Sequence, residues 1–367
     1  MGRICAECGS RMRRGLEDEG FDLVLRPDPV RLVPEHLRSA ALLTTEVASR
    51  PVGLRIGLHI SAFPWEDVAA GLEATAVQAE EAGFDSVWVM DHVRQIPQVG
   101  RDWDPMLESG TALAWIAATT SRVRIGALVS AITLRPIALL GKMIATLDVL
   151  SSGRAQCGIG LGWYEREHAA YGIAFPPVAE RYALLEDALR ALPVLWGPGS
   201  NPFEGRALHL PETICYPRPL QPHIPIVVGG GGERRTLRLA AEHADGVNVM
   251  GDIETVRHKV EVLHRHCDEL GRDRDEVAVT HLAPTLVGAD RADLRDLVDR
   301  LRPPRLDPGA FAARANAGTV DDQIGRLHEL ADAGVDEVIV SLPDLGIDPE
   351  HPAGAVRRFG DVIAAFR

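Results

Sequence analysis

The chain has 367 residues, 46% of them hydrophobic, which is enough to bury a large core in one big domain or two ordinary ones. Its formal net charge of −13 argues against a non-specific nucleic-acid surface, which needs clustered positive charge, so no nucleic-acid partner is expected. The longest apolar run is shorter than the roughly 20 residues of a membrane span, and the N-terminus lacks the order of a signal peptide. We therefore expect a cytoplasmic protein without a membrane partner.

Residues 1–52 carry weak periodicity, several prolines and many charges, and nothing in them predicts a strand that joins a sheet. We interpret them as an N-terminal extension, disordered or dispensable, outside a main domain of residues 53–367. Cys5 and Cys8 have the spacing of half a zinc ribbon, but no second pair or close His pair follows. A zinc site there is the weaker alternative.

From Leu54 onward, short apolar runs alternate with amphipathic segments. The predicted strands are residues 54–60, 86–90, 123–130, 155–159, 226–228, 246–250, a part of 277–287, and 337–342. The predicted helices are residues 65–82, 111–120, 136–150, 178–196, 233–243, 254–270, 292–301, 320–333 and 355–366. Residues 197–225, rich in proline and glycine, interrupt the alternation as an excursion of loops or a hairpin.

Eight strands alternating with helices predict an α/β fold, a (β/α)₈ TIM-type barrel with insertions. A local repeat supports this prediction: AGFDSVWV begins at Ala82, AGVDEVIV at Ala333, and the shorter ADGVNV at Ala244. Each copy is typical of a helix that ends at glycine, a tight turn and a buried strand. An open doubly wound sheet is the alternative, although eight such units in a row fit it poorly.

Glycines alternate at the end of the fourth strand, at Gly158, Gly160 and Gly162, directly before Trp163. Without a Cβ atom, they let the backbone approach something flat or anionic, as in a cofactor shelf with Trp163 as a stacking surface. A dinucleotide fingerprint is disfavoured because Trp163 occupies the third glycine position and no acidic strand end follows about 20 residues later. The alternatives are glycines that only allow tight strand packing, and a tryptophan that only fills the core.

The carboxyl ends of barrel strands carry the active site, and the second strand ends in Asp91-His92. A His beside an Asp can be a proton donor whose tautomer a neighbour fixes, while the alternative is a turn cap beside a polar rim residue. Glu165 and Glu167 follow the fourth strand as polar contacts. No His and carboxylate cluster has metal-ligand spacing, so no metal is predicted.

The fifth strand runs into four consecutive glycines, Gly229, Gly230, Gly231 and Gly232, before Glu233 opens a helix. Free N–H groups before a helix N-terminus favour an anion, so this stretch is the predicted phosphate site. Glu233 tempers the positive field, and a flexible hinge is the alternative.

From about Leu54 to Arg367 the chain resembles the luciferase-like monooxygenase superfamily, particularly its deazaflavin (coenzyme F420) dependent oxidoreductases. The resemblance rests on several motifs in order: AEEAGFDSVWVMDH, ATLDVLSSGRAQCGIGLGWYEREHAAYGI, RYALLEDALRALPVLW, PRPLQPHIPIVVGGGG and LAAEHADGVNV. It implies a bacterial luciferase-like barrel, hydride transfer at the deazaflavin ring, His92 as the catalytic proton-transfer residue, and usually a homodimer. It also implies a set of cofactor contacts: Asp91, His92, a non-proline cis peptide at Leu128-Val129, Gly160, Gly162, Trp163, and the phosphate loop of Gly229, Gly230, Gly231 and Gly232.

One departure bears on the substrate. The sugar-phosphate dehydrogenases of this group carry an acidic residue where this chain has Trp163, and they grip a substrate phosphate with lysines. The only lysines here, Lys142 and Lys259, fall in predicted helices, so a sugar phosphate is disfavoured. The predicted function is F420-dependent hydride transfer to or from an unidentified small organic molecule. The alternatives are a monooxygenase that uses reduced FMN and O₂, a non-catalytic flavin-binding barrel, and a phosphate-ligand isomerase or lyase.

Overall fold

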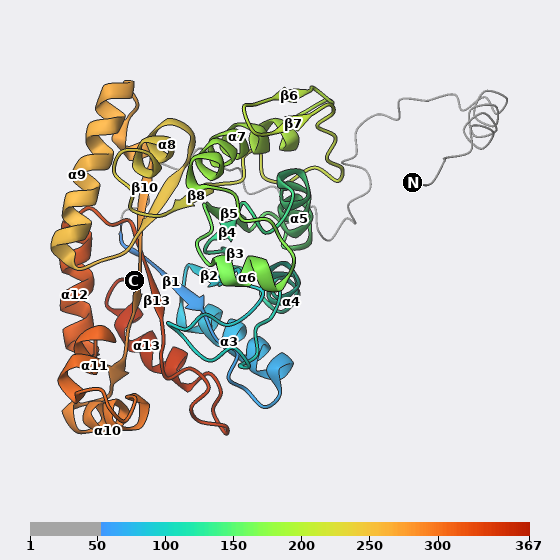
Figure 1. Cartoon of the computed structure of the whole chain (residues 1–367). Helices are drawn as coiled ribbons and strands as arrows, with labels where there is room; N and C mark the ends of the chain where they lie inside the picture. The colour runs from blue at the N-terminus through green and yellow to red at the C-terminus, as the bar shows by residue number, and fades with distance from the viewer. Residues whose placement is uncertain (1–52) are drawn as a thin grey trace. The chain divides into compact units, whose positions relative to one another are not determined.

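A computed structural model describes residues 53–367 and contains a closed barrel of parallel strands surrounded by helices (Figure 1). Around the barrel the strands run β3 (Arg124–Ala127), β2 (Ser86–Val89), β1 (Arg55–Ile60), β13 (Glu337–Ser341), β10 (Ala278–Pro284), β9 (Gly246–Val249), β8 (Ile226–Gly229), β5 (Ala155–Gly160) and β4 (Ser130–Ala131). Pairing of β3 with β5 closes the ring, and β3 and β4 share one position beside β5. The predicted eight-stranded α/β barrel is confirmed.

Helices cover the outside of the barrel. The longer ones are α3 (Val68–Ala82), α4 (Ser109–Thr119), α5 (Ile137–Leu150), α7 (Val178–Trp196), α8 (Thr236–His243), α9 (Ile253–Leu270), α10 (Arg291–Leu301), α12 (Val320–Asp332) and α13 (Gly354–Ala364). Shorter elements are α6 (Glu165–Ala170), α11 (Pro308–Arg314) and the 3₁₀ turn Arg274–Glu276. Two minor strand pairs complete the set: β6 (Phe203–Glu204) with β7 (His209–Leu210), and β11 (Val287–Gly288) with β12 (Gly318–Thr319).

The sequence repeat corresponds to one recurring junction. Its aspartate, which is Asp85, Asp245 or Asp336, accepts a hydrogen bond from a backbone N–H of the preceding barrel strand at 2.7–2.8 Å. In each copy the backbone N–H of the aspartate donates in return to the carbonyl of that same strand residue, at 2.8–2.9 Å. Gly83 and Gly334 provide the left-handed turn, with φ of 90° and 94°. The junction therefore sets the register of neighbouring strands at the amino-terminal edge of the barrel.

Several boundaries differ from the prediction, and three of these differences change the local structure. The third strand is broken, because β3 ends at Ala127 and a cis peptide joins Leu128 to Val129 before β4. The helix after β8 begins at Thr236 rather than Glu233. The proline-rich break after α10 contains α11, whose Asp307 side chain caps the first turn and whose Pro308 occupies it. Proline at the first helical position stabilises a helix start, so the proline marked a helix that the periodicity did not reveal.

Two apolar layers hold the barrel together. The larger lies between the strands and the helices, whereas a smaller one fills the barrel interior with Trp88, Leu128, Val227 and Ile339. Trp88 is fully buried and its indole N–H donates to Ser86. Because these side chains fill the barrel interior, we expect a ligand at the carboxyl ends of the strands, where the active site of such barrels lies.

The structure tests neither of two predictions made for residues 1–52. The N-terminal extension and the Cys5/Cys8 pair lie outside the described residues. Along residues 53–367, every helix is too short or too polar to cross a membrane. The homodimer stays a prediction, and we note that Trp115 of α4 and Leu139 and Leu150 of α5 expose 46%, 51% and 61% of their surface.

Candidate active site

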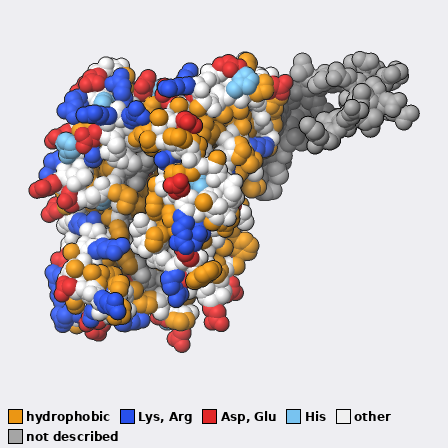
Figure 2. Space-filling model, viewed as in Figure 1, with side chains coloured by type: hydrophobic (Ala, Val, Ile, Leu, Met, Phe, Trp, Pro, Cys, Tyr) orange, Lys and Arg blue, Asp and Glu red, His pale blue; other side chains and the backbone are white. Residues whose placement is uncertain are grey.

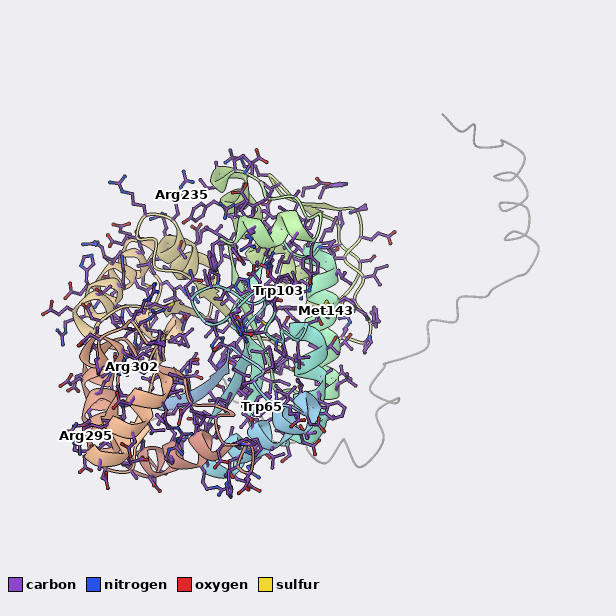
Figure 3. The ribbon with its side chains drawn as sticks, turned by 60° about the horizontal axis from the view of Figure 1, so that its bottom comes forward. Trp65, Trp103, Met143, Arg235, Arg295 and Arg302 are labelled. Carbon is purple, nitrogen blue, oxygen red and sulfur yellow. The ribbon has the colours of Figure 1, made fainter. Side chains whose placement is uncertain are left out.

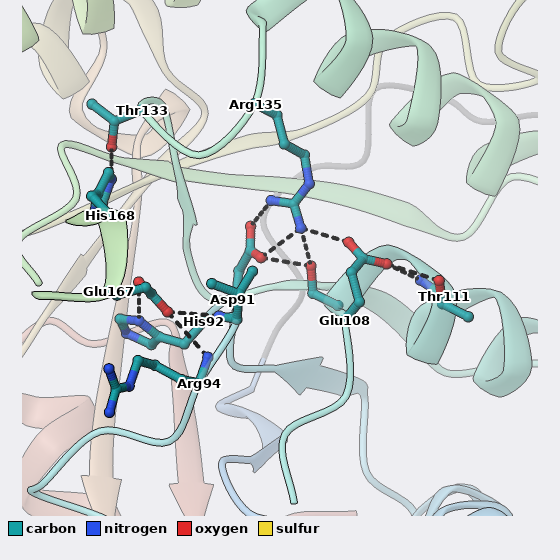
Figure 4. A network of polar contacts seen from close by, with 11 residues as sticks. Asp91, His92, Arg94, Glu108, Thr111, Thr133, Arg135, Glu167 and His168 are labelled. Atoms are coloured by element: carbon teal, nitrogen blue, oxygen red, sulfur yellow. Dashed lines mark hydrogen bonds and ion pairs between the residues drawn. The ribbon is translucent and has the colours of Figure 1, made fainter. Parts of the chain in front are cut away.

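Asp91, directly after β2, forms a buried ion pair with Arg135 (Figure 4). The two guanidinium nitrogens lie 2.7 and 2.9 Å from the two carboxylate oxygens, and the Ser109 hydroxyl donates to Oδ1 at 2.8 Å. Arg135 also reaches Glu108 at the start of α4. The Asp91 carboxylate therefore faces Arg135 rather than His92, and its predicted contact with a cofactor stays a prediction.

His92 takes its partner from α6 instead. Its Nδ1 atom lies 2.9 Å from Oε2 of Glu167, a side chain that is only 1% exposed. The other oxygen of Glu167 accepts the backbone N–H of Val93 at 2.6 Å. Because a carboxylate accepts hydrogen bonds, this contact assigns the proton to Nδ1 and leaves Nε2 of His92 free. The sequence named Glu167 only as a polar contact, and nothing in it identified the His92 pair.

Helix α6 is fixed by a second buried side chain, His168. Its Nδ1 donates to the carbonyl of Tyr164 at 2.9 Å, and its Nε2 accepts from the Thr133 hydroxyl at 2.7 Å. Both ring nitrogens are satisfied, so His168 holds α6 against the loop after β4. The adjacent Glu167 is thereby held in place beside His92.

Trp163 lies beside this pair with its indole accessible. It exposes 52% of its surface and stacks on Tyr164 with ring centroids 5.1 Å apart. The His92 ring approaches Trp163 edge-on at 5.7 Å. The alternative of a core-filling tryptophan is wrong, because a side chain this exposed is free to stack on a planar ligand.

The glycines of β5 face neighbouring strands. A Cβ atom on Gly158 would stand 2.0 Å from the Ala127 carbonyl oxygen, and one on Gly160 would stand 2.7 Å from Cγ2 of Val129. A Cβ on Gly229 of β8 would also collide with Val129, at 2.6 Å. These glycines make room for Val129 just after the cis peptide. The cofactor contacts predicted for Gly160 and Gly162 stay predictions.

His59, the fifth residue of β1, is a site residue that the sequence reasoning missed. Its side chain is 5% exposed, it hydrogen-bonds the Leu128 backbone, and its Nε2 has no hydrogen-bond partner. Burial lowers the pKa of His59 to about 4, the Leu128 hydrogen bond opposes this, and nearby His92 lowers it further. The sequence does contain a sign of this role: His59 is a polar residue between Leu58 and Ile60, at a position of the strand that faces the barrel interior.

The predicted phosphate loop lies at the end of β8. Gly230 has φ of 128°, which only glycine adopts readily, and both Gly230 and Gly232 are exposed. The backbone N–H of Gly230 donates to the Asn248 carbonyl at 3.1 Å. A Cβ on Gly232 would stand 2.9 Å from Oγ1 of Thr236, the first residue of α8. The loop therefore depends on glycine both for its turn and for its approach to the helix.

The negative charge next to this loop is compensated. Glu233 accepts a hydrogen bond from Lys259 at 2.6 Å and contacts His258 at 3.1 Å. The Lys259 hydrogen bond pulls the pKa of Glu233 below its usual range. Cε of Lys259 lies 3.6 Å from the Cβ position at Gly231. A residue of α9 therefore reaches this loop, while the argument against a sugar phosphate as substrate stays a prediction.

The comparison with protein families identifies the chain's relatives. The model of the luciferase-like monooxygenase family matches residues 52–340. The chain belongs to this family. Membership confirms the resemblance and makes the chain an enzyme of an oxidoreductase family, whose named relatives include both dehydrogenases and monooxygenases.

Three relatives illustrate the range. An F420-dependent glucose-6-phosphate dehydrogenase of Kineococcus radiotolerans is 41% identical over 196 residues, 53% of this chain and 55% of that protein. The pyrimidine monooxygenase RutA of Allorhizobium ampelinum is 30% identical over 228 residues, 60% of each chain. A solved F420-dependent secondary alcohol dehydrogenase, in complex with an F420-acetone adduct, has a TM-score of 0.69 at 20% identity, covering 86% of this chain and 99% of that chain. The chain thus spans little more than half of these two curated relatives, and the solved structure shows the fold alone.

Proposed function

We propose that this protein is an F420-dependent oxidoreductase that transfers a hydride between the deazaflavin and a small organic substrate. The observation that carries the proposal is the His92–Glu167 pair, 2.9 Å apart at the carboxyl edge of the barrel and beside the exposed Trp163. Hydride transfer needs alignment and one proton donor or acceptor, which matches a site with one oriented and accessible histidine.

The residues around the site fit a planar phosphorylated cofactor. Val129 projects from the cis peptide between Gly160 and Gly229 and would back the ring, while Trp163 would flank it. The loop Gly229–Gly232 would hold the phosphate through backbone N–H groups other than that of Gly230, which donates to Asn248, and Lys259 would offset the charge of Glu233 beside it. When bound, F420 supplies the carbon that accepts or releases a hydride.

The chain's own residues would then manage the proton. Nε2 of His92 gives a proton to, or takes one from, the reacting oxygen or nitrogen of the substrate, while Glu167 holds Nδ1 and stabilises the imidazolium form. His59 stays neutral below this edge of the barrel, where its buried Nε2 has no hydrogen-bond partner. Burial of His59 and Glu167 excludes water from this side.

A reduced-FMN monooxygenase is the second candidate, favoured by the similarity to RutA. The same barrel edge would hold either cofactor, because both carry a tricyclic ring and a phosphate.

Equilibrium titrations with F420 and with FMN, followed by cofactor fluorescence, separate the two candidates. We expect saturable F420 binding with FMN weak or absent, and no oxygen consumption during turnover. Tighter binding of FMN together with oxygen consumption would overturn the proposal in favour of monooxygenation.

A His92→Ala variant tests the assigned proton carrier. We expect F420 binding close to that of the native protein and a fall of about 10²-fold or more in turnover, since general acid–base catalysis contributes 10²–10⁴-fold. His351→Ala, which removes an exposed histidine from the loop before α13, is the matched control. Unchanged turnover of every substrate in His92→Ala would exclude His92 as the proton carrier and leave the non-catalytic barrel as the alternative.

A further inference from the structure

A basic cleft lies between α7 and α8, next to the glycine loop. It has a volume of about 400 Å³ and is lined by residues from both helices, from the loop before α8 and from the part of the excursion between β6 and β7: Ala179, Tyr182, Ala183, Glu186, Arg206, Arg234, Arg235, Arg238, Leu239 and Glu242. In Figure 2, basic side chains interspersed with acidic ones cover the part of the surface where Figure 1 places α8 and α9. Nothing in the proposed hydride-transfer chemistry uses this cleft.

The charges of the cleft are not balanced internally. Its lining has four guanidinium groups against two carboxylates, in a chain whose overall charge is −13. Among the described residues, Arg206, Arg234 and Arg235 have no carboxylate within ion-pair distance, whereas Arg238 pairs with Glu269 at 3.2 Å. Arg235 lies over the Tyr182 ring, 5.1 Å from its centroid, at the periphery of the molecule in Figure 3. Unpaired arginines that share a concave surface favour an anionic ligand.

The excursion is held so that it presents Arg206 to the cleft. Asp187 of α7, which is 1% exposed, accepts the backbone N–H groups of Ala207 and Leu208, the latter at 3.0 Å. A Cβ on Gly205 would stand 2.4 Å from the same carboxyl group. Both neighbours of Arg206 are thus tied to α7, which fixes its backbone beside the cleft.

The cleft is continuous with the loop assigned to the phosphate. The Tyr182 hydroxyl is hydrogen-bonded to Thr236 at 3.0 Å and lies 3.2 Å from the Cβ position at Gly232. Tyr182 therefore touches the last glycine of the loop and also lines the cleft. A ligand whose phosphate occupies the loop has the arginines next along its path if it continues as a chain.

We propose that this cleft binds the oligo-γ-glutamate tail of F420. The inference rests on the proposed function, since it concerns the part of the same cofactor that lies beyond the phosphate. FMN ends at its phosphate, whereas F420 continues into a chain of glutamates that each carry a carboxylate. Arginine binds carboxylates through paired N–H donors, so the cleft distinguishes F420 from FMN by chemistry that FMN lacks.

The test compares fluorescence titrations of the full chain with three ligands in the absence of substrate: F420 with its glutamates, F420 lacking all glutamates, and FMN. The double variant Arg206→Gln/Arg234→Gln removes two of the three cleft arginines that have no carboxylate partner among the described residues. We expect it to weaken binding of glutamate-bearing F420 about tenfold or more and to leave F420 without glutamates unchanged. The preference of the native protein for glutamate-bearing F420 over F420 without glutamates should also decrease as the salt concentration rises.

The control is Arg295→Gln, an exposed arginine of α10 that lies far from Arg235 in Figure 3. It removes one positive charge outside the cleft, and it should change the affinity for neither form of F420. Equal native affinity for the two F420 forms, or equal weakening of both in the double variant, would overturn the inference and leave the proposed function standing. Binding of FMN with neither F420 form bound would overturn both.

Discussion

The two sides of the barrel mouth satisfy their polar groups differently. After β2, the charged side chains are paired within the protein: Asp91 with Arg135, and His92 with Glu167. After β8, glycines present an exposed loop, and in the adjacent cleft Arg206, Arg234 and Arg235 have no described carboxylate partner. Paired and buried groups cannot move without losing their partners, so they hold a reacting atom in place. Unpaired and exposed groups gain their partners from an anionic ligand, so they select it.

The largest expected effect comes from breaking the paired side. Arg135→Leu leaves the fully buried Asp91 carboxylate without its partner, and we expect the free energy of unfolding to fall by about 3–5 kcal/mol. Urea denaturation followed by circular dichroism measures this change. The control, Arg295→Leu on the surface of α10, should alter stability by less than about 0.5 kcal/mol. If the free energy of unfolding falls as little in Arg135→Leu as in the control, the Asp91–Arg135 ion pair does not stabilise this side of the barrel.

Acidification tests whether the buried histidines stay neutral. Burial lowers the pKa of both His59 and His281 from an ordinary 6.5 to about 4. Between those values the unfolded chain binds protons that the folded chain does not, so stability falls as the pH drops from 6.5 towards 4. At pH 5 each histidine should cost about 2 kcal/mol relative to pH 7.5.

Unfolding in urea at pH 7.5 and at pH 5 measures the effect in the native protein, His59→Asn and His281→Asn. Each variant should lose about 2 kcal/mol less on acidification than the native protein. The carboxylate of Glu80, whose pKa is about 2, adds its own loss only below pH 4.5 and does not interfere. A variant with the native pH dependence would show that its histidine is protonated in the folded state.

A smaller effect separates packing from cofactor binding at Gly160. In Gly160→Ala the new methyl group meets Val129, so we expect a loss of about 1–3 kcal/mol in the free energy of unfolding. Adding Val129→Ala removes the clashing methyl groups and should recover part of that loss, which thermal and urea unfolding of the single and double variants would show. Native stability in Gly160→Ala combined with lost F420 binding would instead support the cofactor shelf.

The alternation of apolar runs and amphipathic segments was sufficient to predict the barrel, because hydrophobic periodicity and glycine caps are local properties. The repeat at Ala82, Ala244 and Ala333 identified junctions in which one aspartate is bonded to the preceding strand. The break at Leu128-Val129 came from the family resemblance, since the apolar run itself predicted an unbroken strand. Helix α6 was not predicted at all, because its six residues are too few for a periodic pattern.

By itself, the sequence determined which segments form strands and helices, the barrel fold and the family, and it placed His92 and the four glycines at strand ends. Only the tertiary structure decided which groups become partners. Glu167 meets His92 across 75 residues and Arg135 meets Asp91 across 44. His59, Lys259 and Arg206 likewise acquire their surroundings only when the ring closes and the helices pack against it. The physical reason is that the state of a polar side chain depends on its burial and on its neighbours in space, and neither is a property of the residues adjacent to it in the chain.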